Sequence, residues 1–256
     1  MLMVISPAKK LDFENKANIK DHSDSEFLDH SQQLADVMKQ YSPLQLSKLM
    51  HLSDKLSQLN AARYGEWQQP FKLSNAKQAV YGFQGDVYQG LDIDSLKKPA
   101  INYLQKNLRI LSGLYGYLKP LDLIQPYRLE MGTKLKNPKG SDLYAFWKET
   151  ITDAVNQTLA NNKKPFLINL ASNEYFKAIN KKSIDAKIIT PAFKDWKNGQ
   201  YKMISFFAKK ARGLMVRYAA ENKISNPEDL KSFDLDGYRF AEDMSTETTW
   251  TFTRKL

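Results

Sequence analysis

The spacing of apolar residues along the chain predicts a mixture of strands and helices. Residues 2–6 form a short apolar run, and Pro7 ends it because proline has no N–H to donate to a neighbouring strand. The polar segment 11–25 has no period and is predicted to be a surface loop. Further strands are predicted at 166–170, 188–193 and 201–205, with an alternating edge strand at 249–253.

Helices are predicted where apolar residues recur at intervals of three and four. Ser42-Pro43 begins one helix, with serine as the N-cap and proline in the first turn, and Ser53-Asp54 begins the next. The segment Pro43 to Tyr64 is therefore predicted to be a helix–hairpin–helix element. The helix before it has the apolar stripe Phe27, Leu34, Val37, Met38 and Tyr41, and the helix after Ser53 is expected to bury Leu52, Leu56 and Leu59.

Tight turns and two longer helices complete the pattern. Residues 79–132 are rich in Gly, Tyr and Pro, which indicates short elements. Ser141 is expected to cap one long helix, another is expected at 206–218, and Asn226-Pro227 opens a short one. Strands and helices alternate, so the predicted class is mixed α/β. No repeat or linker divides the chain, and we expect 1–256 to be a single domain.

The composition indicates a folded chain and excludes several kinds of site. Hydrophobic residues make up 42% of the 256 residues, which is enough for a sizeable core. The absence of cysteine excludes disulfides, thiolate zinc sites, iron–sulfur clusters and a cysteine nucleophile. No segment has the pattern of a secretory signal or the length of a membrane span. We therefore expect a cytoplasmic protein with no membrane partner.

The net charge favours a polyanionic partner. Lys and Arg number 38 and Asp and Glu number 28, which gives a formal charge of +10. Lys and Arg contacts to phosphate supply most non-specific affinity for nucleic acid, so this excess raises the probability of such a partner. A basic surface that only keeps the protein in solution is the alternative.

The predicted helix at 206–218 concentrates these charges. Gly213 on its basic face costs about 1 kcal/mol of helix propensity relative to alanine, which suggests close approach by a phosphate or by a packed helix. Segment 196–220 has six basic and no acidic residues, whereas 221–247 has eight acidic and three basic ones. The helix therefore either binds a polyanion or is neutralised by the acidic segment, which is itself a candidate partner interface. The basic side chains of the helix are Lys209, Lys210, Arg212 and Arg217.

The helical hairpin is a second candidate phosphate site. The helix that begins after Ser53 presents unpaired N–H groups and the positive end of its dipole, and Lys48 and Lys55 flank the turn. The usual DNA-binding version has glycines in the turn, and none is present here. Two helices that merely pack together are the alternative.

A third group of polar residues forms a candidate pocket. Arg128 and Glu130 lie in a Tyr-Arg-Leu-Glu-Met-Gly run, and Glu174 follows a predicted strand. Polar residues at strand ends often bind ligands in α/β folds. The alternative to DNA binding is thus an enzyme acting on a nucleotide or nucleic acid, although an Arg–Glu pair is as often structural. The candidate pocket residues are Arg128, Glu130, Asn169, Ser172, Glu174 and Tyr175.

The sequence contains no recognisable metal or cofactor motif. His22, His30 and His51 have neither i,i+4 pairing nor a glutamate at motif spacing, so we expect them on the surface. There is no nucleophile elbow, Walker loop or dinucleotide fingerprint. We expect no cofactor and no dedicated metal site, and no catalytic residue is assigned.

Several short motifs together resemble one protein family. They run nearly end to end and are Ser6-Pro7-Ala8-Lys9, Ser53-Asp54-Lys55-Leu56, Asn60-Ala61-Ala62-Arg63, Gly85-Asp86-Val87-Tyr88, Leu111-Ser112-Gly113-Leu114-Tyr115-Gly116, Gln125-Pro126-Tyr127-Arg128-Leu129-Glu130-Met131-Gly132, Asn169-Leu170-Ala171-Ser172 and Lys209-Lys210-Ala211-Arg212-Gly213. Their number, order and spacing are similar to those of the peroxide stress resistance protein YaaA family.

The resemblance implies a fold and a function. The fold would be a bent mixed sheet walled by helices around a positively charged cleft. The function would be double-stranded DNA binding in the peroxide stress response, limiting free intracellular iron and oxidative DNA damage. Carried over to this sequence, the hairpin would be Pro43 to Tyr64, and the cleft would draw on Lys9, Lys10, Lys209, Lys210, Arg212 and Arg217.

Overall fold

The computed structural model of the chain describes residues 1–160 and 165–255. An eight-stranded sheet has the order β11-β12-β9-β8-β1-β5-β6, with β10 paired to β9, and two short pairs, β2–β4 and β3–β7, lie outside it. Its strands are β1 (Leu2–Ile5), β5 (Leu108–Ser112), β6 (Gly116–Leu118), β8 (Phe166–Leu170), β9 (Lys187–Lys197), β10 (Gln200–Lys202), β11 (Arg239–Phe240) and β12 (Thr249–Arg254). The short pairs comprise β2 (Lys10–Leu11), β4 (Phe83–Gln84), β3 (Lys77–Gln78) and β7 (Leu123–Ile124).

The centre of the sheet is parallel. β1 pairs in parallel with β5 on one side and with β8 on the other, and β8–β9 and β9–β12 are also parallel. All four residues of β1 are at most 1% exposed. Such a continuous apolar run is typical of a strand that is covered on both faces, and this is why 2–6 has no alternating pattern.

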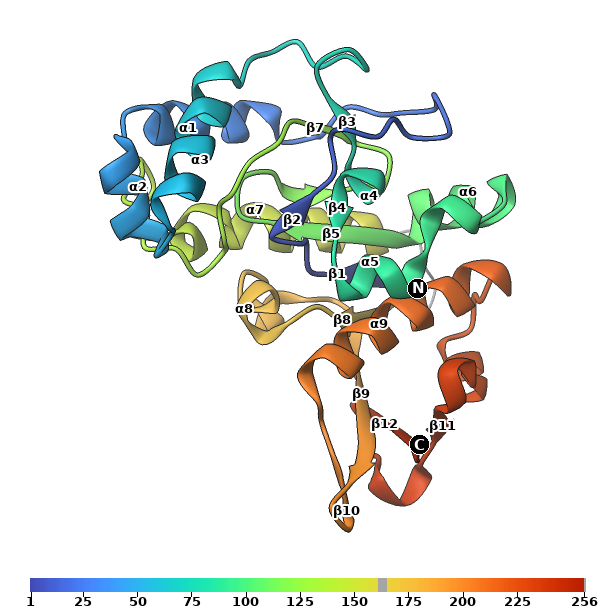
Figure 1. The fold of residues 1–256 in the computed structure, drawn as a ribbon. Coiled ribbons are helices and arrows are strands. Elements are labelled where there is room, and N and C mark those ends of the chain that lie inside the picture. Colours follow the sequence, from blue (N-terminus) through green and yellow to red (C-terminus); the bar gives the residue numbers. More distant parts are fainter. Residues whose placement is uncertain (161–164, 256) are drawn as a thin grey trace.

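Helices cover both faces of the sheet. Figure 1 shows α7 behind β5, and α5 with α9 in front, while α1, α2 and α3 form a group at the opposite end of the molecule from β10. Three 3-10 segments, η3 (Pro227–Ser232), η4 (Leu235–Gly237) and η5 (Glu242–Met244), lead into the last strand, and η1 (Ile93–Ser95) and η2 (Lys181–Ser183) lie earlier. The α-helices are α1 (Leu28–Lys39), α2 (Pro43–Met50), α3 (Asp54–Glu66), α4 (Ala79–Gly82), α5 (Asp86–Leu91), α6 (Lys98–Asn107), α7 (Leu143–Leu159), α8 (Asn173–Phe176) and α9 (Ser205–Glu221).

One continuous hydrophobic core joins these elements, which confirms a mixed α/β fold in a single compact domain. The aromatic rings of Phe193, Phe233 and Phe252 extend the core to the far end of the sheet, with centroids 5.6 to 5.9 Å apart. None of the helices in the described part of the chain is both long and apolar enough to cross a membrane.

Three predictions about the position or cap of an element were wrong. The segment 249–253 is not an edge strand, because β11 pairs with its outer side. The segment 201–205 is mostly not a strand, because β10 ends at Lys202 and α9 begins at Ser205. Asp142, and not Ser141, caps α7, its Oδ1 accepting the N–H of Ala145 at 2.8 Å.

The expected buried stripe of the third helix is also incorrect. Leu52 is buried, but Leu56 and Leu59 are 38% and 44% exposed. The face of α3 that is buried instead carries Ser57, Asn60 and Tyr64. Ser57 Oγ and Asn60 Nδ2 donate to carbonyls of their own helix, Asn60 Oδ1 is buried without a partner among the described residues, and the Tyr64 hydroxyl donates to the carbonyl of Arg128 at 2.9 Å. The buried face of α3 is therefore its polar one, joined to the rest of the fold by Tyr64, which the periodicity of leucines does not reveal.

Candidate functional site

A cavity of about 500 Å³ lies at the carboxyl ends of β1 and β8. The chain goes from β1 to β5 on one side and later returns to β8 on the other. The loops that follow β1 and β8 therefore diverge, and such a switch point is where open α/β sheets bind ligands. Ser6 and Ser172 begin these two loops and tie them together, since the Ser172 N–H donates to Ser6 Oγ at 2.8 Å.

Basic side chains from separate elements line this cavity. Lys9 and Lys10 come from the loop and short strand after β1, and Lys209 and Arg212 come from α9. The last two are three residues apart and so share one face of the helix. We call Lys9, Lys10, Lys209 and Arg212 the cleft cations. The first three are exposed, while Arg212 is partly buried.

No carboxylate among the described residues forms an ion pair with Arg212. Within the described residues it makes no hydrogen bond and no ion pair, and burial lowers the pKa of its guanidinium below the ordinary value. An arginine stays charged in proteins nonetheless, and the N–H groups of Arg212 are not among the buried unpartnered atoms of the described residues, so they reach solvent. An anion entering the cavity would replace water as the acceptor for these groups.

Acidic side chains line the same cavity. Glu130 bridges two cations, with Oε1 accepting from Arg128 Nη2 at 2.9 Å and Oε2 lying 2.6 Å from Lys9 Nζ. Glu174 accepts the N–H of Gly132 through Oε1 at 2.9 Å. The cavity thus combines unpaired positive charge with carboxylates held in place by the fold.

The structure brings together most of the candidate pocket predicted from the sequence. Arg128, Glu130, Ser172, Glu174 and Tyr175 all line the cavity. Asn169 does not, and its Oδ1 instead accepts the N–H of Ala171 at 3.1 Å, shaping the turn that follows β8.

Residues from α5 and the strand before it were missed as lining groups. Gln84, Asp86 and Tyr88 border the cavity, and the Tyr88 hydroxyl donates to the carbonyl of Ser6 at 3.1 Å. The only signal in the sequence was the Gly85-Asp86-Val87-Tyr88 motif, which contributed to the family resemblance without indicating a position.

The glycine at position 213 of α9 is required by the close packing of α5. A methyl group at this position would overlap the carbonyl oxygen of Val87 in α5, and one at Gly90 would overlap the carbonyl oxygen of Lys210 in α9. The two glycines let the backbones of α5 and α9 touch. Because both helices line the cavity, this contact fixes the distance between its walls.

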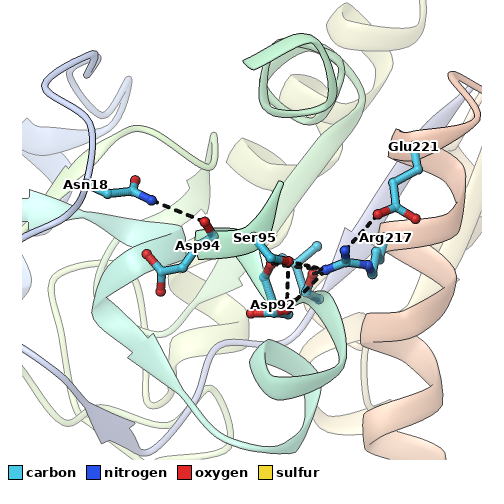
Figure 2. Close-up of polar contacts among 7 residues, drawn as sticks. Asn18, Asp92, Asp94, Ser95, Arg217 and Glu221 are labelled. Carbon is cyan, nitrogen blue, oxygen red and sulfur yellow. Dashed lines mark hydrogen bonds and ion pairs between the residues drawn. The ribbon is translucent and has the colours of Figure 1, made fainter. Parts of the chain in front are cut away.

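Lys210 and Arg217 point away from the cavity and are paired. Lys210 Nζ lies 3.4 Å from Asp236, a residue of the acidic segment. Arg217 contacts Asp92 at 3.3 Å and Glu221 at 2.7 Å, and its Nη1 also donates to Ser95 Oγ at 2.7 Å, as Figure 2 shows. The acidic segment therefore neutralises part of α9, and only Lys209 and Arg212 of its basic side chains reach the cavity. The predicted DNA-binding role of Lys210 and Arg217 is untested, and the Arg217→Gln variant distinguishes it from a purely structural role.

Arg217→Gln is expected to destabilise the fold by about 2 kcal/mol, because a partly buried guanidinium loses its charged partners and its hydrogen bonds to the end of α5. Urea unfolding measures this loss. The folded variant is expected to bind DNA like the parent chain, and an affinity loss that exceeds tenfold without loss of stability would contradict the structural role.

The predicted hairpin residues lie on α2 and α3, away from the cavity. Both helices form where the sequence predicts, and Lys48 and Lys55 are exposed on either side of the turn. Ser53 caps α3, with its Oγ 3.5 Å from the N–H of Leu56. A DNA-binding role for Lys48, Ser53 and Lys55 stays a prediction.

The histidines are not gathered into a metal site. His22 and His51 are exposed, but His30 is partly buried and its ring is stacked on that of Trp147 at 5.8 Å, contrary to the predicted surface position. Over residues 1–160 and 165–255, no three His, Asp or Glu side chains are arranged to hold a metal ion.

Comparison with known protein families shows to which family the chain belongs. A family model described as peroxide stress protein YaaA matches residues 1–244. The chain belongs to this family. Membership of the YaaA family supports a role in peroxide stress.

Curated relatives match over their whole length. A UPF0246 protein of Chromobacterium violaceum is 56% identical over 254 residues, which is 99% of each chain. A UPF0246 protein of Colwellia psychrerythraea is 58% identical over 255 residues, 100% of this chain and 99% of the relative. A third, from Ralstonia pickettii, is 53% identical over 256 residues and covers both chains completely.

Proposed function

We propose that this YaaA-family chain binds double-stranded DNA, with the cleft cations contacting backbone phosphates. The observation that carries the proposal is Arg212, a partly buried cation that lines the cavity and has no partner among the described residues. A phosphate oxygen is the acceptor that best matches the planar fork of a guanidinium.

The distribution of charge supports a long polyanion as the partner. Lys9, Lys10 and Lys209 are exposed around the same opening, and they come from two distant parts of the sequence. Phosphate contacts carry no sequence information, so the binding is expected to be tolerant of DNA sequence. Lys48 and Lys55 on the helical hairpin form a proposed second contact along the DNA.

The role in peroxide stress follows from DNA as the target. A protein bound along the backbone in the cytoplasm covers DNA that peroxide and iron would otherwise damage. We propose that the effect on free iron is indirect, because the proposed contacts involve lysine and arginine side chains, which are not iron ligands.

A salt titration tests the proposal. Fluorescence anisotropy with a labelled duplex at several salt concentrations is expected to show log affinity falling with log salt, with a slope of about −0.9 for each phosphate contacted. Four contacts by the cleft cations correspond to a slope of about −3.6. Affinity that stayed flat between 50 and 200 mM salt would rule out phosphate contacts as the source of binding.

A further inference from the structure

We propose that the cavity between β1, β8 and α9 binds a single nucleotide unit, with its phosphate at Lys209 and Arg212. The inference rests on the proposed function for the phosphate-bearing class of ligand, and it deepens that site because Lys209 and Arg212 are two of the cleft cations. The nucleotide comes either from solution or from a DNA strand in which it is unpaired, and both sources present the same phosphate, sugar and base.

The size of the cavity favours one nucleotide. A volume of about 500 Å³ is within the usual range of small-molecule sites. An intact duplex keeps its bases stacked inside and presents only its phosphates and grooves, so it contacts the rim and leaves the cavity itself unfilled. A free nucleotide, or a nucleotide turned out of the stack, has the dimensions to enter.

The charges in the cavity call for a ligand that carries both an anion and hydrogen-bond donors. Arg212 and Lys209, which form no ion pair with any described residue, supply positive charge for a phosphate. A simple anion has no hydrogen-bond donor for the carboxylates of Glu130 and Glu174 and would be repelled by them. A nucleotide offers sugar hydroxyls or base amino groups that donate to carboxylate oxygens.

Glu130 is positioned to accept such bonds. Arg128 and Lys9 each hold one of its oxygens, which fixes the position of the carboxylate between two cations. Oε1 already accepts two N–H groups of Arg128, at 3.1 and 2.9 Å, so the remaining acceptor capacity lies on Oε2 beside Lys9. Glu174 uses Oε1 to accept the N–H of Gly132, and its Oε2 has no partner in the described part of the chain.

Tyrosine rings provide an apolar wall for a base. Tyr88, Tyr127 and Tyr175 line the cavity and are each less than 10% exposed. Burial raises the pKa of all three phenols, so their rings stay uncharged. The hydroxyls of Tyr88 and Tyr127 are already bonded to Ser6 and Ser112, which leaves ring surface as what these two residues offer a ligand.

The test is calorimetric titration of the full chain with the four deoxynucleoside monophosphates and with inorganic phosphate. We expect at least one nucleotide to bind at least tenfold more tightly than inorganic phosphate. Arg212→Gln is expected to weaken that binding at least tenfold. Arg63→Gln is the matched control, since Arg63 is also partly buried and without a partner among the described residues but lines a different cavity.

A second pair of variants keeps the result interpretable. Lys209 is exposed, so Lys209→Gln is expected to fold normally and to weaken nucleotide binding, which guards against a folding defect in Arg212→Gln. Glu130→Gln is expected to reduce the advantage of the nucleotide over inorganic phosphate. Unchanged nucleotide affinity in both Lys209→Gln and Arg212→Gln would refute the proposal that these residues bind the phosphate in this cavity.

Duplexes measured in parallel show whether the bound nucleotide comes from solution or from DNA. They also distinguish failure of the nucleotide site from failure of the DNA-binding proposal. A duplex with one unpaired 2-aminopurine is expected to change its fluorescence on binding, in an Arg212-dependent way, if the nucleotide comes from DNA, whereas tight binding of monophosphates alone indicates a free nucleotide. If neither ligand binds better than inorganic phosphate or intact duplex, the inference is overturned. Salt-sensitive binding of intact duplex would then still stand, whereas nucleotide binding without any duplex binding would refute the DNA proposal and leave the cavity as a nucleotide site.

Discussion

Replacing the four cleft cations with glutamine is expected to weaken duplex DNA binding by at least about 100-fold at 50 mM salt, because four phosphate contacts and their released counterions are lost. The slope of log affinity against log salt is expected to become about 3.6 smaller in magnitude. The loss is expected to be similar for duplexes of unrelated sequence. Lys9 contributes despite its contact with Glu130, since its side chain is 63% exposed and such surface pairs are weak.

The matched control removes the same amount of charge elsewhere. Four exposed lysines outside the cleft, changed together to glutamine, are expected to lower affinity only slightly and to leave the salt slope nearly unchanged. Equal losses in both quadruple variants would show that net charge, and not the cleft, attracts DNA. The control lysines are Lys106, Lys148, Lys182 and Lys223.

Gly213→Ala is expected to destabilise the protein by about 3 kcal/mol or more, at the upper end of overpacking effects. The added methyl group would overlap the carbonyl oxygen of Val87 and lie 2.8 Å from the N–H nitrogen of Leu91. These neighbours are backbone atoms of α5, so no side-chain rotation relieves the clash and the two helices must separate. Urea unfolding measures the loss, and the folded fraction is expected to bind DNA less tightly because Lys209 and Arg212 move with α9.

Gly65→Ala separates this contact from helix propensity. Gly65 lies in α3 with no atom within 4 Å of the added methyl group, so the change is expected to stabilise the protein by up to about 1 kcal/mol. Gly213→Ala would gain the same propensity, so a stabilising effect there would mean that α5 and α9 do not touch.

Local sequence patterns predicted where most helices and strands lie, but they predicted less well which of their faces and edges are buried. Apolar runs located β1 and β8, and the Ser–Pro pair located the beginning of α2, because these signals depend on neighbouring residues only. The exposure of Leu56 was not predictable, since it depends on which face of α3 finds partners in distant loops. The segment 249–253 has an alternating pattern, yet its place inside the sheet was decided by β11.

Some features of the candidate site could likewise be predicted from the sequence, and others could not. The sequence alone showed an excess of positive charge, its concentration in 206–218, the run containing Arg128 and Glu130, and the motifs of the YaaA family. It also determined that Lys209 and Arg212 share a helix face, because a spacing of three is a property of any α-helix.

Only the tertiary structure decided which charges remain available. Asp92 and Asp236 are far from α9 in sequence, and folding brings them to Arg217 and Lys210 while leaving Arg212 without a partner among the described residues. Likewise, Gly213 is fitted to α5, and the loops after β1 and β8 meet at one cavity because their strands are neighbours. Net charge and hydrophobic periodicity can be read from the sequence. Which charged side chains form ion pairs, and which residues line a cavity, depend on contacts between segments that only the fold brings together.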